Sequence, residues 1–321
     1  MMNTLHSMIN NSQKIFRYLY VDLHDYHETI FLAGSPRSGT TWLQEIINYK
    51  NEYRVIFEPF YPQKVKKIDK WRPIQYLNEN ENSPMYLEPM TDILSGRIRN
   101  SWVDKYNKLF LVDKRIIKAV RANLILFWIK KHFPEVPIIL LLRHPCAVAN
   151  SKINIIKNWF PESYNPLNRI FVQDKLMEDF LRPYEEKLRD AKTIFEQCIF
   201  MWCIETIIPI KLFHEDEIHI TFYENLCTNA INEIKNVFSF IDKPFLLDFL
   251  KAVPVPSSKS VQNSAINLGT DLIKTWRENI THNQLHKAIE ILCLFGLDKI
   301  YNDNDYPLLS SREILKEYGQ N

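Results

Sequence analysis

Short apolar segments alternate along this chain with longer stretches in which apolar residues recur at helical spacing. Five segments have the length and β-branched composition of buried strands: residues 30–33, 54–57, 115–120, 136–142 and 217–222. Helical periodicity predicts helices at residues 41–48, 122–132, 147–157, 191–213, 230–241 and 283–295. Because this alternation is typical of a parallel sheet with helices on both faces, we predict an α/β fold.

The pattern does not divide the chain into separate units. No repeat, linker or low-complexity tract interrupts the 321 residues, so we predict one domain, residues 1–321, with an N-terminal extension at residues 1–28. Residues 59–106, rich in Pro, Asn and aromatic residues, and residues 253–270, which open near Val-Pro-Val-Pro, lack clear periodicity. We expect ligand-binding loops there, although ordinary surface loops have the same composition.

Composition restricts the partners and the compartment. Lys and Arg total 40 against 38 acidic residues, so a net charge of +2 argues against a nucleic-acid partner and requires any anion site to be local. The five cysteines are scattered without a C-x-x-C pair, which argues against a disulfide framework and a zinc site. No apolar run approaches the ~20 residues of a membrane helix. We therefore expect a cytoplasmic protein without an integral membrane segment, and the oligomeric state is not indicated.

A small-residue loop follows the first predicted strand. Gly-Ser-Pro-Arg-Ser-Gly-Thr-Thr occupies residues 34–41 and leads into an amphipathic segment. The spacing has the outline of a phosphate-binding loop, in which backbone N–H groups point at phosphate oxygens. Thr40 stands where such loops carry Lys, and the cation is Arg37, inside the loop. The loop therefore favours a phosphate-like ligand other than a Mg²⁺-bound triphosphate.

A second anion-binding pattern follows the fourth predicted strand. Residues 136–142 are followed directly by Arg143, and Ser151 lies eight residues later in a predicted helix. Open α/β sheets bind ligands at the carboxyl ends of their strands, and a guanidinium binds phosphate bidentately. We expect Arg143 and the Ser151 hydroxyl to bind one phosphate.

Several segments carry a family resemblance. Residues 35–43, Ser-Pro-Arg-Ser-Gly-Thr-Thr-Trp-Leu, resemble the 5′-phosphosulfate loop of the sulfotransferases that use 3′-phosphoadenosine 5′-phosphosulfate (PAPS). Leu-Arg-His-Pro at residues 142–145, with Ala-Asn-Ser at residues 149–151, resembles their 3′-phosphate element. Residues 220–226 resemble the family's segment whose Tyr borders the adenine, with Asn225 in place of an acidic residue. Residues 276–280 are similar to the segment that closes the family's domain.

The resemblance implies a P-loop-type parallel sheet, transfer of a sulfuryl group from PAPS to a hydroxyl or amine, and no metal. It assigns the 3′-phosphate to Arg143 and Ser151 and the adenine to Tyr223. The Arg-Lys-Gly element of many members is not evident, and Ser258 and Lys259 are possible substitutes. The residues that it assigns to the 5′-phosphosulfate are Pro36, Arg37, Ser38, Gly39, Thr40, Thr41 and Trp42.

The general base departs from the cytosolic members, which use a His two residues after a Lys on a central strand. Here Lys118 is followed by Val120, which accepts no proton. Other branches use a Glu at the end of the second strand, and Glu58 ends such a strand here. We therefore predict Glu58 as the base, Lys118 as a contact of the sulfuryl oxygens and Arg37 as the cation at the leaving oxygen. The alternatives are a Glu58 exposed to water or paired with Arg54, and a purely structural Lys118.

The acceptor is not identified by the sequence, and a small molecule, a glycan or a lipid fits equally well. Loops after Glu58 and after Ser151, including Trp159 and Phe160, are expected to line its pocket. Two rival functions stay open: a nucleoside-triphosphate-dependent P-loop kinase, and a non-catalytic nucleotide-binding protein on the same fold. Residues 22–28, with two His among carboxylates, are interpreted as a solvated face instead of a metal site.

Overall fold

A computed structural model describes residues 20–251 and 273–320. Its centre is a five-stranded sheet in which every neighbouring pair is parallel, in the order β3-β5-β2-β6-β7. A separate two-stranded parallel sheet pairs β1 (Val21–Asp22) with β4 (Leu111–Val112). The large sheet consists of β2 (Thr29–Gly34), β3 (Tyr53–Phe57), β5 (Lys114–Ala119), β6 (Ile138–Leu142) and β7 (His219–Phe222). All five predicted strands belong to it.

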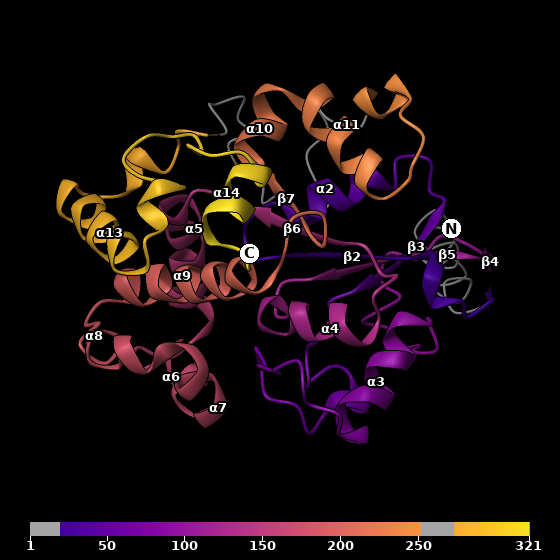
Figure 1. The fold of residues 1–321 in the computed structure, drawn as a ribbon, viewed down its shortest axis with the longest axis horizontal. Coiled ribbons are helices and arrows are strands. Elements are labelled where there is room, and N and C mark those ends of the chain that lie inside the picture. Colours follow the sequence, from indigo (N-terminus) through magenta and orange to yellow (C-terminus); the bar gives the residue numbers. More distant parts are fainter. Residues whose placement is uncertain (1–19, 252–272, 321) are drawn as a thin grey trace, which may run out of the picture.

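Helices connect the strands and cover the sheet (Figure 1). Each predicted helix is present, with ends shifted by a few residues, whereas α3, α6, α7, α8, α10 and α14 were not predicted. The α-helices are α2 (Thr40–Ile47), α3 (Pro84–Leu94), α4 (Leu126–His132), α5 (Pro145–Trp159), α6 (Asn168–Phe171), α7 (Asp174–Leu176), α8 (Glu185–Arg189), α9 (Ile194–Leu212), α10 (Tyr223–Thr228), α11 (Ala230–Phe240), α13 (His282–Phe295) and α14 (Ser311–Tyr318).

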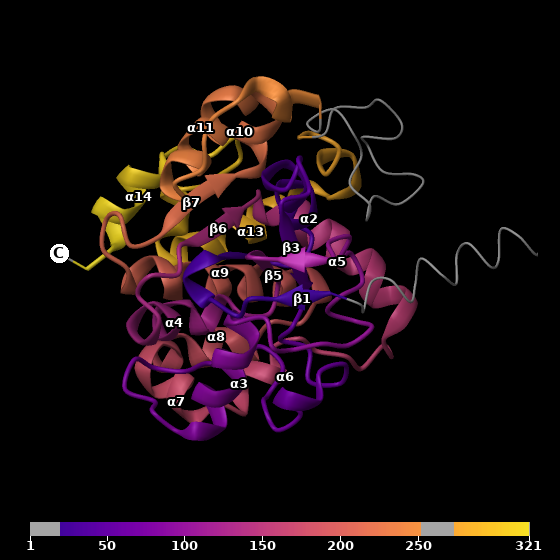
Figure 2. The same ribbon diagram turned by 90° about the vertical axis from the view of Figure 1, so that its right-hand side faces the viewer.

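The two faces of the sheet bury separate hydrophobic clusters, because successive side chains of a strand point to opposite faces. Leu32 packs in a cluster with Leu43 of α2 and Val237 of α11. Phe31, the preceding residue, packs in the cluster that contains α4 and α9. Figure 2 shows α2, α10 and α11 above the sheet and α4 and α9 below it. This three-layer arrangement confirms the predicted α/β fold with helices on both faces.

Helix α9 is the central helix of the lower layer. It begins with a capping box formed by Thr193 and Glu196, and most of its residues are buried. The interpretation of residues 191–213 as a core helix is therefore confirmed. Among the residues that the structure describes, no helix combines the length and hydropathy needed to cross a bilayer.

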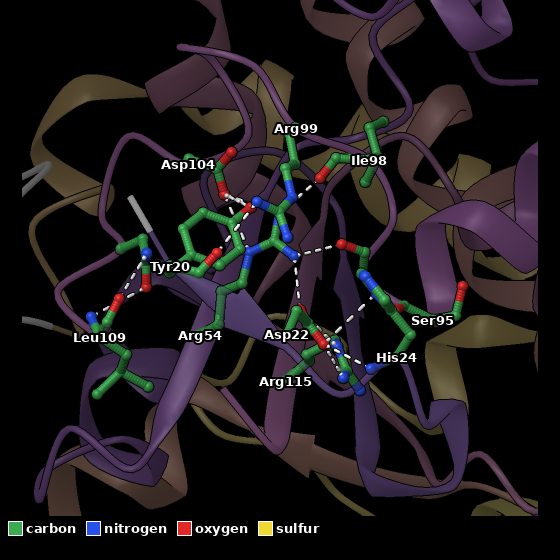
Figure 3. A network of polar contacts seen from close by, with 12 residues as sticks. Tyr20, Asp22, His24, Arg54, Ser95, Ile98, Arg99, Asp104, Leu109 and Arg115 are labelled. Atoms are coloured by element: carbon green, nitrogen blue, oxygen red, sulfur yellow. Dashed lines mark hydrogen bonds and ion pairs between the residues drawn. The ribbon is translucent and has the colours of Figure 1, made fainter. Parts of the chain in front are cut away.

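A buried ion-pair network ties the N-terminal segment to the sheet (Figure 3). Arg54 Nη1 donates to Asp22 Oδ2 at 2.8 Å, and Arg54 Nη2 donates to Asp104 Oδ1 at 2.8 Å. Arg115, the second buried guanidinium, also ion-pairs with Asp22. Burial alone would raise the pKa of Asp22, but hydrogen bonds from Arg115, His24 and Arg54 hold it below its usual value.

This network corrects two expectations. The solvated face predicted for residues 22–28 is wrong at Asp22, which is buried and ion-paired. The alternative pairing of Glu58 with Arg54 is also wrong, because two other carboxylates bind this guanidinium. The physical reason is that two buried guanidiniums need buried carboxylates, and the folded chain supplies these from distant segments.

Candidate active site

The predicted site residues gather where the strands of the large sheet end, which we call the carboxyl edge. Glu58 follows β3, Lys118 lies near the end of β5, residues 35–39 follow β2, Arg143 follows β6 and Tyr223 follows β7. The strand order therefore places the loop at the middle of the edge, with Glu58 on one side and Arg143 and Tyr223 on the other. The connection from β2 leads to β3 on one side, whereas the connection from β5 crosses to β6 on the other side of β2, which makes this the switch point where open α/β sheets bind ligands.

The loop between β2 and α2 is closed by Gly39, the N-cap of α2. Gly39 has a φ of 99°, and a Cβ there would lie 2.6 Å from Cδ2 of Tyr223, so both backbone and space require glycine. Within the described ranges, the N–H groups of Gly39, Thr40 and Thr41 donate to no protein acceptor. These three donors at a helix N-terminus suit an anion.

Several other residues of the loop and of α2 are buried. Ser38 is fully buried, and its hydroxyl donates to the carbonyl of Ser35 at 2.7 Å instead of facing outward. Thr40, Thr41 and Trp42 are also buried, whereas Pro36 is partly exposed. The Trp42 ring meets Tyr223 edge-on with centroids 5.6 Å apart. The Ser38 hydroxyl thus stabilises the conformation of the loop.

Arg37 and Arg143 lie next to each other. Nη1 of Arg143 donates to the carbonyl of Arg37 at 3.2 Å, and its guanidinium lies 4.0 Å from the centre of the Tyr223 ring. Arg37 has a φ of 79°, unusual for a residue with a side chain. Burial first, and then the charge of Arg143, lower the pKa of Arg37. In the part of the chain that is described no carboxylate pairs with Arg37, so the arrangement favours an anion.

Helix α5 positions Ser151 against the loop that follows β2. Its hydroxyl accepts a hydrogen bond of 2.8 Å from Nε of Arg37. A hydroxyl that accepts in this way keeps its own hydrogen for a second partner. Ser151 therefore links the two predicted anion sites.

Glu58 is buried in a cluster of donors. Lys118 Nζ donates to Oε1 at 2.5 Å, while the backbone N–H of Val120 and Nη1 of Arg121 each donate to Oε2 at 3.2 Å. The side chain is only 4% exposed, which rules out the alternative of a Glu58 in water. Its φ is 46°, so Arg37 and Glu58 both adopt a backbone conformation that is costly for residues with side chains.

Two members of the site were not found in the sequence. Arg121, three residues after Lys118, contacts Glu58 directly. Glu205 of α9 is buried, and its Oε2 accepts from the Ser35 hydroxyl at 2.5 Å and from Nζ of Lys152 at 3.5 Å. A signal existed for Glu205, since it is the only charged residue in the apolar stretch 198–210. Such a carboxylate requires a buried partner.

Buried neutral and acidic side chains stabilise the turn after β6. Glu224 accepts from the N–H of His144 at 2.9 Å and from the Tyr301 hydroxyl at 2.7 Å. The His144 ring stacks on Trp276 with centroids 4.3 Å apart. Burial lowers the pKa of His144 to about 3, which keeps the ring neutral near pH 7. His144 thus supports the position of Arg143.

The described structure does not bring some predicted residues to the site. Ser258 and Lys259, with all of residues 253–270, fall outside the described residues. Trp159 is 81% exposed at the end of α5. Across residues 20–251 and 273–320, no group of three or more His, Cys, Asp or Glu side chains could hold a metal ion.

Comparisons with known proteins identify the family. Residues 27–288 match the sulfotransferase domain family, which is well over half of the chain. No curated protein matches the sequence. Among solved structures, mouse sulfotransferase SULT7A1 in complex with PAP is 13% identical with a TM-score of 0.44, covering 95% of this chain and 94% of its own. The sulfotransferase domain of the Synechococcus PCC 7002 olefin synthase is 14% identical with a TM-score of 0.41, covering 84% and 94%. By the sequence match, this chain belongs to the sulfotransferase family, whose enzymes use PAPS.

Proposed function

We propose that this protein transfers a sulfuryl group from PAPS to a hydroxyl or amine of a small-molecule, glycan or lipid acceptor, with Glu58 as the general base. The observation that carries the proposal is the adjacent pair Arg37 and Arg143 beside the unpartnered N–H groups at the start of α2. Two guanidiniums and a helix N-terminus fit a nucleotide with phosphate groups at two positions. Glu58 lies on the same carboxyl edge.

The proposal assigns each part of the nucleotide to residues of this site. Residues 36–42 would hold the 5′-phosphosulfate, Arg143 and Ser151 the 3′-phosphate, and the Tyr223 ring would border the adenine. Bound PAPS would supply the activated sulfuryl group. Arg37 and the loop amides would stabilise the charge that develops on the leaving oxygen, because fixed donors in a buried site need little reorganisation.

Glu58 has the geometry of an oriented base. A carboxylate offers about four acceptor positions, and three donors occupy this one, which leaves a position for the proton of the acceptor. Lys118 and Arg121 fix the carboxylate from two sides, and Lys118 also lies 5.1 Å from the centre of the Phe57 ring. We propose that Lys118 contacts the sulfuryl oxygens in addition to orienting Glu58.

Thermal unfolding in the presence of nucleotides tests the proposal. We expect 3′-phosphoadenosine 5′-phosphate (PAP) to stabilise the protein by about 2.7 kcal/mol at roughly 100-fold over its dissociation constant, a shift of a few degrees. AMP, which lacks the 3′-phosphate, should stabilise it less. In Arg143→Ala the PAP affinity should fall by about 1.5–3 kcal/mol, the usual loss for a charged hydrogen bond, while AMP binding changes little.

The control is Arg312→Ala on α14, whose side chain is 76% exposed and pairs with Glu215. This variant should keep the full PAP shift. A shift with Mg²⁺-ATP but not with PAP would contradict the proposal and favour the kinase. Binding of PAP without transfer from PAPS to any acceptor would favour the non-catalytic binding protein.

A further inference from the structure

A pocket of about 480 Å³ lies between two segments that follow Glu58 and Ser151 along the chain. These are the segments in which the sequence predicted acceptor-binding loops. One wall comes from the first segment and the other from the segment between α5 and α7. Its lining includes Arg72, Pro73, Tyr164, Asn165, Asn168 and Arg169.

The two walls are joined by buried hydrogen bonds. Gln173 is buried, and its side chain donates to the Ile74 carbonyl at 3.0 Å and accepts from the Tyr76 N–H at 2.8 Å. The Tyr76 hydroxyl donates to Asp179 at 2.8 Å. Figure 1 shows α6 and α7 beside the purple segment that precedes α3. The pocket is therefore formed by fixed walls.

The backbone next to Arg72 is held in an uncommon conformation. Ile74 has a φ of 59°, a genuine outlier for a β-branched residue. Its carbonyl is the group that Gln173 binds. Conformations of this kind persist only where the surroundings impose them, and they cluster at ligand sites. The turn fixes how Arg72 and Pro73 face the pocket.

The pocket has two cations without counter-charges. Within the described residues, neither Arg72 nor Arg169 pairs with a carboxylate, and the Arg169 guanidinium lies 5.6 Å from the centre of the Tyr164 ring. In the same part of the chain Arg182 and Arg189 both pair with Glu185. Asn165 and Asn168 add hydrogen-bonding groups. This lining fits an anion with a planar or polar body.

The segment that supplies the Arg72 wall of the pocket also contacts the cation beside the proposed base. Nη1 of Arg121 lies 3.2 Å from Glu58 Oε2, and its guanidinium lies 4.4 Å from the centre of the Tyr61 ring. The segment that follows Glu58 therefore contacts the cation beside the proposed base through Tyr61 and lines the pocket through Arg72 and Pro73.

We propose that Arg72 and Arg169 bind an anionic group on the acceptor, so that the substrates of this enzyme are hydroxyl or amine compounds that already carry a carboxylate, phosphate or sulfate. This inference rests on the proposed function and names the acceptor class of the same site. The anion is held in the pocket while the reacting hydroxyl or amine extends toward Glu58.

Binding to the 321-residue chain saturated with PAP tests the proposal, with titration calorimetry as the readout. The probes are pairs that differ in one anionic group: glucuronate against glucose, 4-hydroxyphenylacetate against 4-methylphenol, and glucose 6-phosphate against glucose. We expect the anionic member to bind roughly 10- to 100-fold more tightly in at least one pair, as a charge-assisted contact predicts. Comparison of the glucuronate pair with the glucose 6-phosphate pair shows whether the pocket prefers a carboxylate or a phosphate.

The preference should disappear in the double variant Arg72→Gln/Arg169→Gln, while its PAP affinity stays that of the wild type. The matched control Arg182→Gln/Arg312→Gln removes two exposed arginines that have carboxylate partners, and it should keep the preference. Equal binding of neutral and anionic probes, retention of the preference in the first variant, or no binding of any anionic probe would overturn the inference. Failure of the wild type to bind PAP would instead contradict the proposed function.

Discussion

Glu58 is fixed more tightly than a residue at the end of a strand requires. Its backbone N–H donates to the Lys118 carbonyl at 2.8 Å, and its own carbonyl accepts from the Trp102 indole at 3.1 Å. Together with Lys118 and Arg121 at the carboxylate, these contacts hold a backbone with a positive φ. A site that maintains such a conformation presents one carboxylate orientation to its ligand.

The Glu58→Gln variant should therefore lose turnover by about 10²–10⁴, because the amide cannot take the acceptor's proton. PAP affinity should be nearly unchanged. Initial rates with PAPS, together with PAP titration, measure both. Glu52→Gln is the control, since Glu52 directly precedes β3, has a side chain that is 43% exposed and pairs with Lys243. Turnover like that of the wild type in Glu58→Gln would remove Glu58 from the role of base.

At the scale of elements, the turn from β2 into α2 depends on other parts of the fold. Tyr223, at the start of α10, packs against Gly39, and Glu205 of α9 holds Ser35 at the other end of the loop. Ser151 of α5 holds Arg37 between them. Three helices thus fix one short loop, which is how a scaffold preorganises an anion site.

Gly39→Ala tests this arrangement, because its methyl group would meet the Tyr223 ring at 2.6 Å in a backbone with a φ of 99°. We expect a loss of PAP binding together with a lower melting temperature. Gly296→Ala is the matched control: its φ is 70°, but the nearest atom to a Cβ is 3.9 Å away. It should cost about 1–2 kcal/mol for the left-handed backbone and leave PAP binding intact. Equal effects of the two variants on PAP binding would contradict the role of the Tyr223 contact.

At the scale of the whole molecule, buried charges lie at both ends of the sheet. Arg54 and Arg115 lie near the starts of β3 and β5 and are neutralised by Asp22 and Asp104. Arg37 at the opposite edge has no such carboxylate among the residues described. Buried charges are stable when they are paired, so the amino end of the sheet is structural and the carboxyl edge is the place for an anionic ligand.

The global stability should also depend on pH through His144. Its pKa is about 3 in the folded protein and ~6.5 in an unfolded chain. Between these values the unfolded chain binds more protons, so the free energy of unfolding falls as the pH is lowered through this range, by at most about 1.4 kcal/mol per pH unit. Urea unfolding between about pH 7 and pH 4 measures the slope.

His144 is the N-cap residue of α5, and asparagine also suits that position. The His144→Asn variant should therefore show a smaller dependence of the unfolding free energy on pH. His286→Asn replaces a ring that is 78% exposed and should leave the slope unchanged. An identical slope in wild type and His144→Asn would mean that the buried ring does not contribute to the acid sensitivity.

Local information in the sequence determined the fold class and the main parts of the site. Continuous apolar runs predicted the five strands, because strands that are buried on both faces need apolar residues at successive positions. The spacing of Gly34 and Gly39 around Arg37 predicted the loop, because tight turns need backbone conformations that glycine adopts most easily. Arg143 was found in the same way, as a polar residue directly after a predicted strand, whereas Glu58 and Lys118 were predicted from the family resemblance.

Tertiary structure decided the partners, because contacts between distant segments depend on strand order and packing. Only the folded chain shows that Glu58 contacts Lys118 and Arg121, that Arg54 binds Asp22 and Asp104, and that Ser151 meets Arg37. The pocket between Arg72 and Arg169 joins segments about a hundred residues apart. The sequence pattern does not predict these pairings, because each side chain can bind several others until the fold buries it beside one partner.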